Sequence, residues 1–187
     1  MNFIFEGPDN SGKTTLIETL RQELAANNIV PITMKFSSLG LSDPLKEKEL
    51  QEIGYLHAFL KLFSNKTNIS IICDRFHFGE YVYGYLIRGY ESNIFQWEEI
   101  FKLSRPEVYD KTILIYVTAT YEELLRREDN LSLCKEKKKF LELQRFEEAY
   151  RKSHLKKIKL INNTINDLEK NKEMIRKVVR EMIGGSN

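Results

Sequence analysis

Short, wholly apolar runs alternate along the chain with longer segments in which apolar side chains recur every three or four residues. The apolar runs at residues 3–5, 29–36, 69–73, 112–119 and 158–161 predict five strands. Strands that are apolar on both faces and separated by helices are typical of a buried parallel sheet. We therefore predict an α/β fold, a three-layer sandwich built around a five-stranded parallel sheet.

The helical repeats lie between and after these runs. They predict helices over residues 13–27, 94–104, 120–128 and 167–183, with a further long helix around 140–150. Another helix is expected to begin at Asp43-Pro44, since aspartate caps helices and proline suits the first helical position. Its apolar face is predicted to consist of Ile53, Leu56, Leu60 and Phe63.

Composition narrows the class of protein. The chain has 187 residues, which suits one domain over 1–187, with 42% hydrophobic and 30% charged residues. A net charge of +2 does not by itself imply nucleic-acid binding. The two cysteines, Cys73 and Cys134, form neither a disulfide framework nor a metal-ligand pattern. Apolar runs stay well short of about 18 residues, so we expect no membrane partner and a cytoplasmic location.

A glycine-rich loop follows the first predicted strand. Gly7 to Thr14 fits the phosphate-binding pattern G-x-x-x-x-G-K-[ST]. The glycines allow a tight turn with inward N–H groups, Lys13 would reach the β- and γ-phosphates, and Thr14 would ligate Mg²⁺. We assign nucleoside triphosphate binding to this loop, against the simpler reading of a glycine-rich turn with a chance lysine. The residues assigned to it are Gly7, Asn10, Ser11, Gly12, Lys13, Thr14 and Thr15.

A second polar pair ends the third predicted strand. Asp74 and Arg75 come directly after the apolar run at 69–73, and ligands bind at the carboxyl ends of such strands. Asp74 is a candidate to hold Mg²⁺ opposite Thr14, and Arg75 a candidate to grip a phosphate. The alternative is a helix cap beside a surface ion pair.

Two further features concern the rest of the site. Asp9 lies among phosphate-binding N–H groups, so its carboxylate is expected to face outward toward an acceptor hydroxyl, unless it forms a local turn with Asn10 and Ser11.

The stretch 126–139 is rich in cations and suits a mobile lid that closes on the donor. A solvated, lysine-rich helix start is the alternative. The cations in this stretch are Arg126, Arg127, Lys135, Lys137, Lys138 and Lys139.

The segment 5–15, the triplet Asp74-Arg75-Phe76 and the stretch after Arg126 together resemble the thymidylate kinase family, across nearly the whole chain in element order. The resemblance implies P-loop kinase topology, ATP and Mg²⁺ as cofactors, a closing lid and a possible homodimer. It implies transfer of the γ-phosphoryl group of ATP to a deoxynucleoside monophosphate. Asn10 stands where some members carry a loop arginine, which resembles members whose catalytic arginine lies in the lid.

The motifs, the chain's own residues and the resemblance together assign roles over the site. Lys13, Asp9, Arg75 and Arg127 are assigned to catalysis, Arg126 to ATP, and Thr14 and Asp74 to the metal. Acceptor binding is assigned to Asp9, Lys35, Phe36, Phe59, Arg75, Glu80 and Tyr83.

The chain departs from the family pattern on the acceptor side. Gly84 replaces the glutamine that reads thymine, and no arginine occurs between Arg21 and Arg75, where the acceptor phosphate is usually clamped. Lys35 is a possible substitute, as a point charge. The segment from Asp74 to Gly84, followed by Arg88-Gly89-Tyr90, also resembles phage-type members, some of which phosphorylate a hydroxymethyl pyrimidine in DNA.

Three hypotheses follow from these residues. The first is a kinase of deoxynucleoside monophosphates. The second is a kinase of a hydroxyl on a nucleoside or on DNA, with Glu80 or Asp9 as the general base. The third is a nucleotide-binding protein without catalysis.

Overall fold

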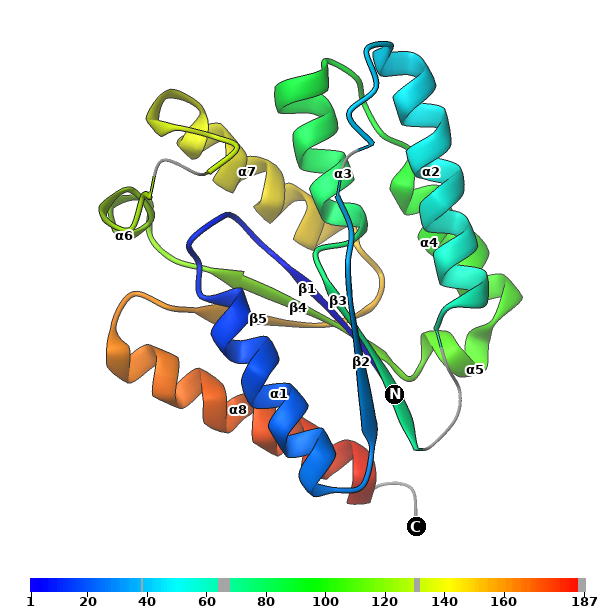
Figure 1. The fold of residues 1–187 in the computed structure, drawn as a ribbon, viewed down its shortest axis with the longest axis vertical. Helices are drawn as coiled ribbons and strands as arrows, with labels where there is room; N and C mark the ends of the chain where they lie inside the picture. The colour runs from blue at the N-terminus through cyan, green and yellow to red at the C-terminus, as the bar shows by residue number, and fades with distance from the viewer. Residues whose placement is uncertain (38, 64–67, 130–131, 185–187) are drawn as a thin grey trace.

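The computed structural model describes residues 1–37, 39–63, 68–129 and 132–184. Its centre is a single five-stranded, all-parallel sheet with strand order β2-β3-β1-β4-β5. The strands are β1 (Asn2–Glu6), β2 (Val30–Lys35), β3 (Ile69–Asp74), β4 (Thr112–Thr118) and β5 (Lys156–Ile161). Helices cover both faces, so the predicted three-layer α/β sandwich is confirmed (Figure 1).

The helices divide into two layers. Their bounds are α1 (Lys13–Ala26), α2 (Pro44–Lys61), α3 (His77–Tyr83), η1 (Gly84–Arg88), α4 (Ile94–Ser104), α5 (Pro106–Tyr109), α6 (Tyr121–Arg126), α7 (Glu136–Lys152) and α8 (Ile165–Gly184). Helices α1 and α8 pack together on one face, while α2, α3, α4 and α7 cover the other (Figure 1).

Strand β1 shows how the two cores arise. Successive side chains of a strand point to opposite faces, so Phe3 and Phe5 enter the core beneath α1 and α8, while Ile4 enters the other. All three are fully buried. Because β1 lies at the centre of the sheet, the loop that follows it emerges in the middle of the carboxyl edge.

Helix α2 begins as predicted, but its apolar face was predicted only in part: Phe63 is buried, and Leu56 and Leu60 are half-buried. The Asp43 side chain accepts hydrogen bonds from the backbone N–H groups of Leu45 and Lys46, which confirms the cap. Ile53, predicted to be buried, is 53% exposed. The face that is buried consists of Glu47, Gln51, Glu52, Tyr55, Ala58 and Phe59. Two glutamates can lie inside because partners from other segments satisfy them, as described below.

The predicted lid overlaps two helices. Arg126 is the last residue of α6, and α7 begins at Glu136, so the end of the stretch 126–139 is already helical. Residues 130 and 131 of this stretch lie outside the described residues, and its mobility stays a prediction. Residues 185–187 also lie outside them, so one domain over 1–187 stays a prediction too.

The two cysteines, Cys73 and Cys134, are buried and unpaired. Within the described part of the chain, no helix combines the length and the apolar character needed to cross a bilayer.

Candidate active site

The loop between β1 and α1 has the backbone of a phosphate cradle. Gly7 and Gly12 adopt φ angles of 142° and 92°, and Asn10 between them adopts 63°. A Cβ atom at Gly7 would lie 1.9 Å from the carbonyl oxygen of Val117, so only glycine fits there. Residues with positive φ that lead into the start of a helix form the kind of loop whose backbone N–H groups bind anions.

Lys13 is buried inside this loop. Its Nζ atom donates hydrogen bonds to the carbonyl oxygens of Gly7, at 2.9 Å, and Pro8, at 2.6 Å. Burial, followed by repulsion from Arg75, lowers the pKa of Lys13 to about 7. Polyanionic phosphates would favour its charged form.

A cavity of about 410 Å³, which we call the phosphate cavity, opens beside the loop. It is lined by Asp9, Asn10, Gly12, Lys13, Thr14, Lys35, Asp74, Arg75 and Arg127. The Thr14 hydroxyl and the Asp74 carboxylate are hard oxygen donors of the kind that Mg²⁺ prefers. No cluster of three or more histidine, cysteine or acidic residues suited to a metal occurs among the described residues. A magnesium ion would therefore take its other ligands from water and phosphate.

A second cavity of about 410 Å³, the aromatic cavity, adjoins the first. It is lined by Asp9, Lys35, Phe36, Ser37, Tyr55, Arg75, Phe76, Gly79, Glu80, Tyr83, Ile87, Arg88 and Leu133. Phe36, Tyr55 and Phe76 form one wall, with ring centroids 4.7 to 5.9 Å apart. Of the residues that the structure describes, three line both cavities: Asp9, Lys35 and Arg75.

Arg75 joins the loop to helix α3. It adopts a φ of 65°, which is unusual for a residue other than glycine and is often found at functional sites. Its Nη2 atom forms an ion pair with Asp9, and its Nη1 donates to the Tyr83 hydroxyl at 3.1 Å. Although burial lowers its pKa, Tyr83 and Asp9 raise the pKa of Arg75 above its ordinary value. Arg75 therefore stays charged between the cavities.

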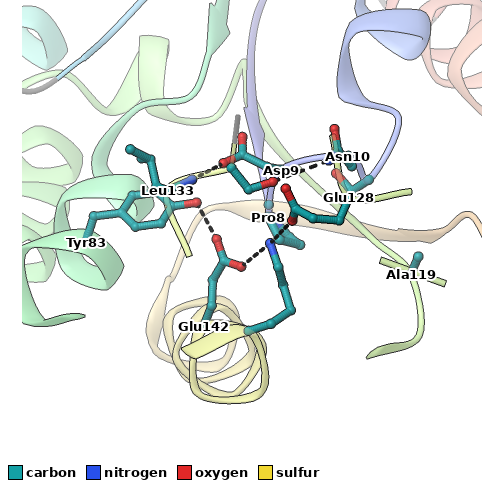
Figure 2. A network of polar contacts seen from close by, with 12 residues as sticks. Pro8, Asp9, Asn10, Tyr83, Ala119, Glu128, Leu133 and Glu142 are labelled. Atoms are coloured by element: carbon teal, nitrogen blue, oxygen red, sulfur yellow. Dashed lines mark hydrogen bonds and ion pairs between the residues drawn. The ribbon is translucent and has the colours of Figure 1, made fainter. Parts of the chain in front are cut away.

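The segment after α6 contacts the loop directly. The backbone N–H of Leu133 donates to Asp9 Oδ2 at 3.1 Å, and Asn10 Nδ2 donates to Ser132 Oγ at 3.3 Å. Figure 2 shows Leu133 beside Asp9, and below them the Tyr83 hydroxyl directed at Glu142. Arg127 Nη1 donates to the Asn10 carbonyl at 3.4 Å. The predicted lid thus begins to cover the loop.

The lid cations do not all face the phosphate cavity. Arg127 lines it, whereas Arg126 lines a third cavity of about 250 Å³. The third cavity is lined by Gly12, Arg126, Arg127, Asn162, Thr164, Ile165 and Leu168. Lys139 is fully buried, 3.0 Å from Glu142 and 3.7 Å from Glu128, and it is not among the residues that line the phosphate cavity. The other lysines of the stretch, Lys135, Lys137 and Lys138, are exposed.

Most of the remaining predicted site residues lie either at the aromatic cavity or in the loop. Phe36, Glu80 and Tyr83 line the aromatic cavity together with Lys35. Gly7 and Ser11 belong to the loop and contact Lys13, and Thr15 is exposed on α1.

Phe59 lies elsewhere: it is fully buried, and its ring packs 4.8 Å from that of Phe76, behind the cavity wall. The described residues that line the aromatic cavity do not include it, so Phe59 supports the wall and does not border the ligand space.

Sequence reasoning missed Tyr55, Arg88 and Leu133 in the aromatic cavity and Asn162 beside the loop. Asn162 Nδ2 donates to the Ser11 carbonyl at 2.9 Å and lies 2.8 Å from a Cβ built on Gly12. Arg88 comes from η1, a π-helical turn that the spacing of apolar residues does not predict. In the sequence, Arg88 is marked only by being an arginine within an aromatic segment.

No protein-family model matches the chain, and no curated protein matches it by sequence. Solved structures do. The YorR protein of Bacillus subtilis, in complex with phosphorylated GDP, aligns with a TM-score of 0.70 at 21% identity, over 97% of this chain and 98% of its own. Thymidylate kinase from Ehrlichia chaffeensis aligns with a TM-score of 0.58 at 19% identity, over 96% and 98%. Deoxyadenosine kinase from M. mycoides, with bound dCTP, aligns with a TM-score of 0.58 at 16% identity, over 97% and 100%.

These likenesses concern the fold. The chain has the P-loop kinase fold, an all-parallel five-stranded sheet with flanking helices, over almost its whole length.

Proposed function

We propose that this protein is an ATP-dependent phosphotransferase that moves the γ-phosphoryl group of ATP to a deoxynucleoside monophosphate. The observation that carries the proposal is the junction between the two cavities. The phosphate cavity and the aromatic cavity share Asp9, Lys35 and Arg75, so a donor and an acceptor would meet at two cations and one carboxylate. Such positioning is the main requirement of phosphoryl transfer.

The donor half is assigned to the loop and the phosphate cavity. The triphosphate of ATP would lie against the N–H groups of residues 7–15, with Lys13 on the β- and γ-phosphates. Thr14 and Asp74 would hold Mg²⁺, which neutralises phosphate charge when it is bound. The third cavity, with Arg126, Ile165 and Leu168, offers a guanidinium plane and apolar side chains for the adenine ring.

The acceptor half is assigned to the aromatic cavity. Its volume falls within the range of about 300–1,000 Å³ that small-molecule sites occupy. Phe36, which packs on the buried Phe76, offers its ring to a nucleobase. Lys35 and Arg75 lie at the junction, where the acceptor phosphate must approach the γ-phosphoryl group. Asp9, beside them, is assigned to the acceptor sugar.

The mechanism follows from charge and position. Arg75, fixed by Asp9 and Tyr83, would align the attacking oxygen of the acceptor. Lys13 and Arg127 would stabilise the negative charge that spreads over the transferring group. Since phosphoryl transfer needs little covalent help from protein, no nucleophilic side chain is invoked.

The names of the similar structures support the same class of substrate. They comprise a thymidylate kinase, a deoxyadenosine kinase with bound dCTP, and YorR with phosphorylated GDP. Each acts on or binds a nucleotide or nucleoside, and the proposal extends that chemistry to this chain.

A screen with γ-labelled ATP tests the proposal. Monophosphates, nucleosides and hydroxymethylated DNA are offered as acceptors, and label transfer to a monophosphate is the expected result. Transfer only to a hydroxyl would favour the second hypothesis, for which Asp9 is the better base, because Glu80 lines only the aromatic cavity. Nucleotide binding without transfer to any acceptor would leave a binding protein.

The possible homodimer and the closing of the lid stay predictions. Light scattering on the purified chain would test the first, and proteolysis of residues 126–139 with and without ATP the second.

A further inference from the structure

One of the two arginines that line the aromatic cavity, Arg88, is held in a fixed position. The Arg88 side chain, 13% exposed, lines the cavity and comes from the π-helical turn η1. Its Nη2 donates to Glu80 Oε2 at 2.7 Å, and its Nη1 lies 3.5 Å from Glu47 Oε1. The guanidinium carbon also lies 5.3 Å from the centre of the Tyr90 ring. Two carboxylates and an aromatic face therefore orient this guanidinium from three sides.

Gly84 and Tyr90 explain why this arrangement is possible. A Cβ atom on Gly84 would lie 2.7 Å from the Tyr90 ring, so that ring occupies the space of any side chain at position 84. Tyr90 also donates its hydroxyl to Glu80 Oε1 at 2.5 Å, and its N–H to the Gly84 carbonyl at 3.0 Å. An amide side chain at position 84 is excluded. Glu80 also lines the cavity, but its two oxygens already accept from Tyr90 and Arg88, so the polar donor left for a ligand is the Arg88 fork.

A guanidinium offers only hydrogen-bond donors. It matches two acceptors side by side, such as the O6 and N7 atoms of a 6-oxopurine, and it is mismatched to an exocyclic amino group. A 4-oxopyrimidine presents one oxygen in the same place. The 3.5 Å separation from Glu47 exceeds an ordinary hydrogen bond, so Nη1 retains N–H groups for a ligand.

We propose that Arg88 is the specificity-determining residue of the aromatic cavity and selects nucleotides with a 6-oxopurine base. The inference rests on the proposed function, in which this cavity takes the acceptor. Glu47, Glu80 and Tyr90 are positioning residues, since they act through Arg88.

The test compares two acceptors that differ at position 6 of the purine. Binding of dIMP and dAMP is measured by the rise in melting temperature and by titration calorimetry, with a non-hydrolysable ATP analogue present. The wild-type protein should bind dIMP at least ~10-fold more tightly than dAMP, the scale of one bidentate contact. dGMP should resemble dIMP, and dTMP should bind more weakly than dIMP.

The variant is Arg88→Lys, which keeps a cation between Glu47 and Glu80 but loses the fork. The ratio of dIMP to dAMP affinity should fall toward about 1, whereas a purely structural role would weaken both nucleotides equally. The matched control is Arg145→Lys. Arg145 is 12% exposed, pairs with Glu91 and Glu148, and lies outside both cavities among the described residues. This control should keep the wild-type ratio.

Three results would overturn the proposal. The first is dAMP binding as tightly as dIMP in the wild-type protein, and the second is an unchanged ratio in Arg88→Lys. Both would leave the proposed kinase function intact. The third is the absence of binding by any monophosphate, which would remove the acceptor assignment itself.

Discussion

Asp9 and Arg75 form an ion pair where the two cavities meet, although they lie in different loops of the chain. Asp9 belongs to the phosphate-binding loop, and Arg75 follows β3, the neighbour of β1 in the sheet. Because β1 and β3 are parallel, their carboxyl ends lie side by side and bring the two loops together. The ion pair therefore lies between the proposed donor site and the proposed acceptor site.

Removal of the Lys13 amine should abolish most of the turnover. We expect Lys13→Ala to lower kcat by at least ~10²-fold, the scale for a lost electrostatic group in a transition state. Steady-state kinetics with γ-labelled ATP and the best acceptor of the screen would measure it. Lys177→Ala, on the exposed surface of α8, is the control and should keep wild-type turnover. Near-normal turnover of Lys13→Ala would contradict the donor site.

Removal of Arg75 should affect the acceptor more than ATP. A charge-assisted hydrogen bond contributes about 1.5–3 kcal/mol, so we expect the acceptor KM of Arg75→Ala to rise ~10- to 100-fold. The affinity for ATP, measured separately by calorimetry, should change far less, because Lys13 and the loop N–H groups remain. Arg75→Lys should recover part of the loss, since it keeps the charge but not the fork. Equal losses for both substrates would argue against the assigned role.

The fold was predictable because its signals are local. Wholly apolar strands and the loop at residues 7–14 identify the sheet, its parallel direction and the phosphate end. The buried face of α2 was not predictable from the same signals. Glu47 pairs with Arg88, and Glu52 accepts hydrogen bonds from Ser92 and from the N–H of Asn93, about forty residues away. Apolar spacing cannot reveal a glutamate whose partner is that distant.

The candidate site likewise contains residues that the sequence predicted and residues that it missed or misplaced. The loop at residues 7–14 and the pair Asp74-Arg75 follow or end neighbouring parallel strands, as their motifs predicted, while their chemical roles stay predictions. Arg88 was missed because a π turn has no apolar period, and its position depends on how Tyr90 packs against Gly84. Phe59 was placed in the acceptor site, although its ring lies behind Phe76, because helical spacing does not show which layer of a wall a side chain occupies.

A buried ion pair beneath the lid should be important for stability. Lys139 lies between Glu142 and Glu128, and Glu142 also accepts from the Tyr83 hydroxyl at 2.6 Å (Figure 2). Lys139→Ala would leave the buried Glu142 carboxylate without its cation, at a cost of about 3–5 kcal/mol. For a chain of this size the melting temperature should fall by roughly 6–20 °C.

Thermal and urea unfolding would measure this change. Lys137→Ala, an exposed neighbour on α7, should have no comparable effect. The double variant Lys139→Met with Glu142→Gln removes both charges and should recover part of the loss. A single variant as stable as the wild type would show that the pair contributes nothing.

The stability of the protein in acid should depend on Glu98. This carboxylate is buried with His77, and His77 Nε2 lies 2.5 Å from Glu98 Oε1. The Ser153 hydroxyl donates to the same oxygen at 2.7 Å, and the N–H of His154 donates to Oε2 at 2.9 Å. Burial alone would raise the pKa of Glu98, but the hydrogen bond from His77 and the other donors lower it below its ordinary value of 4.5. A carboxylate with a lowered pKa stabilises the folded state above its unfolded pKa, and that stabilisation is lost as the pH falls through the folded pKa.

The variant Glu98→Gln should therefore be less stable than the wild type at pH 7, by about 1.5–3 kcal/mol. The difference should narrow as the pH falls below 4.5, because only the wild type must then protonate Glu98. Urea unfolding of both proteins at a series of pH values would measure the two curves. Glu99→Gln changes the exposed neighbour on α4 and should follow the wild-type curve. A constant difference between Glu98→Gln and the wild type across the acid range would show that the lowered pKa of Glu98 does not contribute to folding.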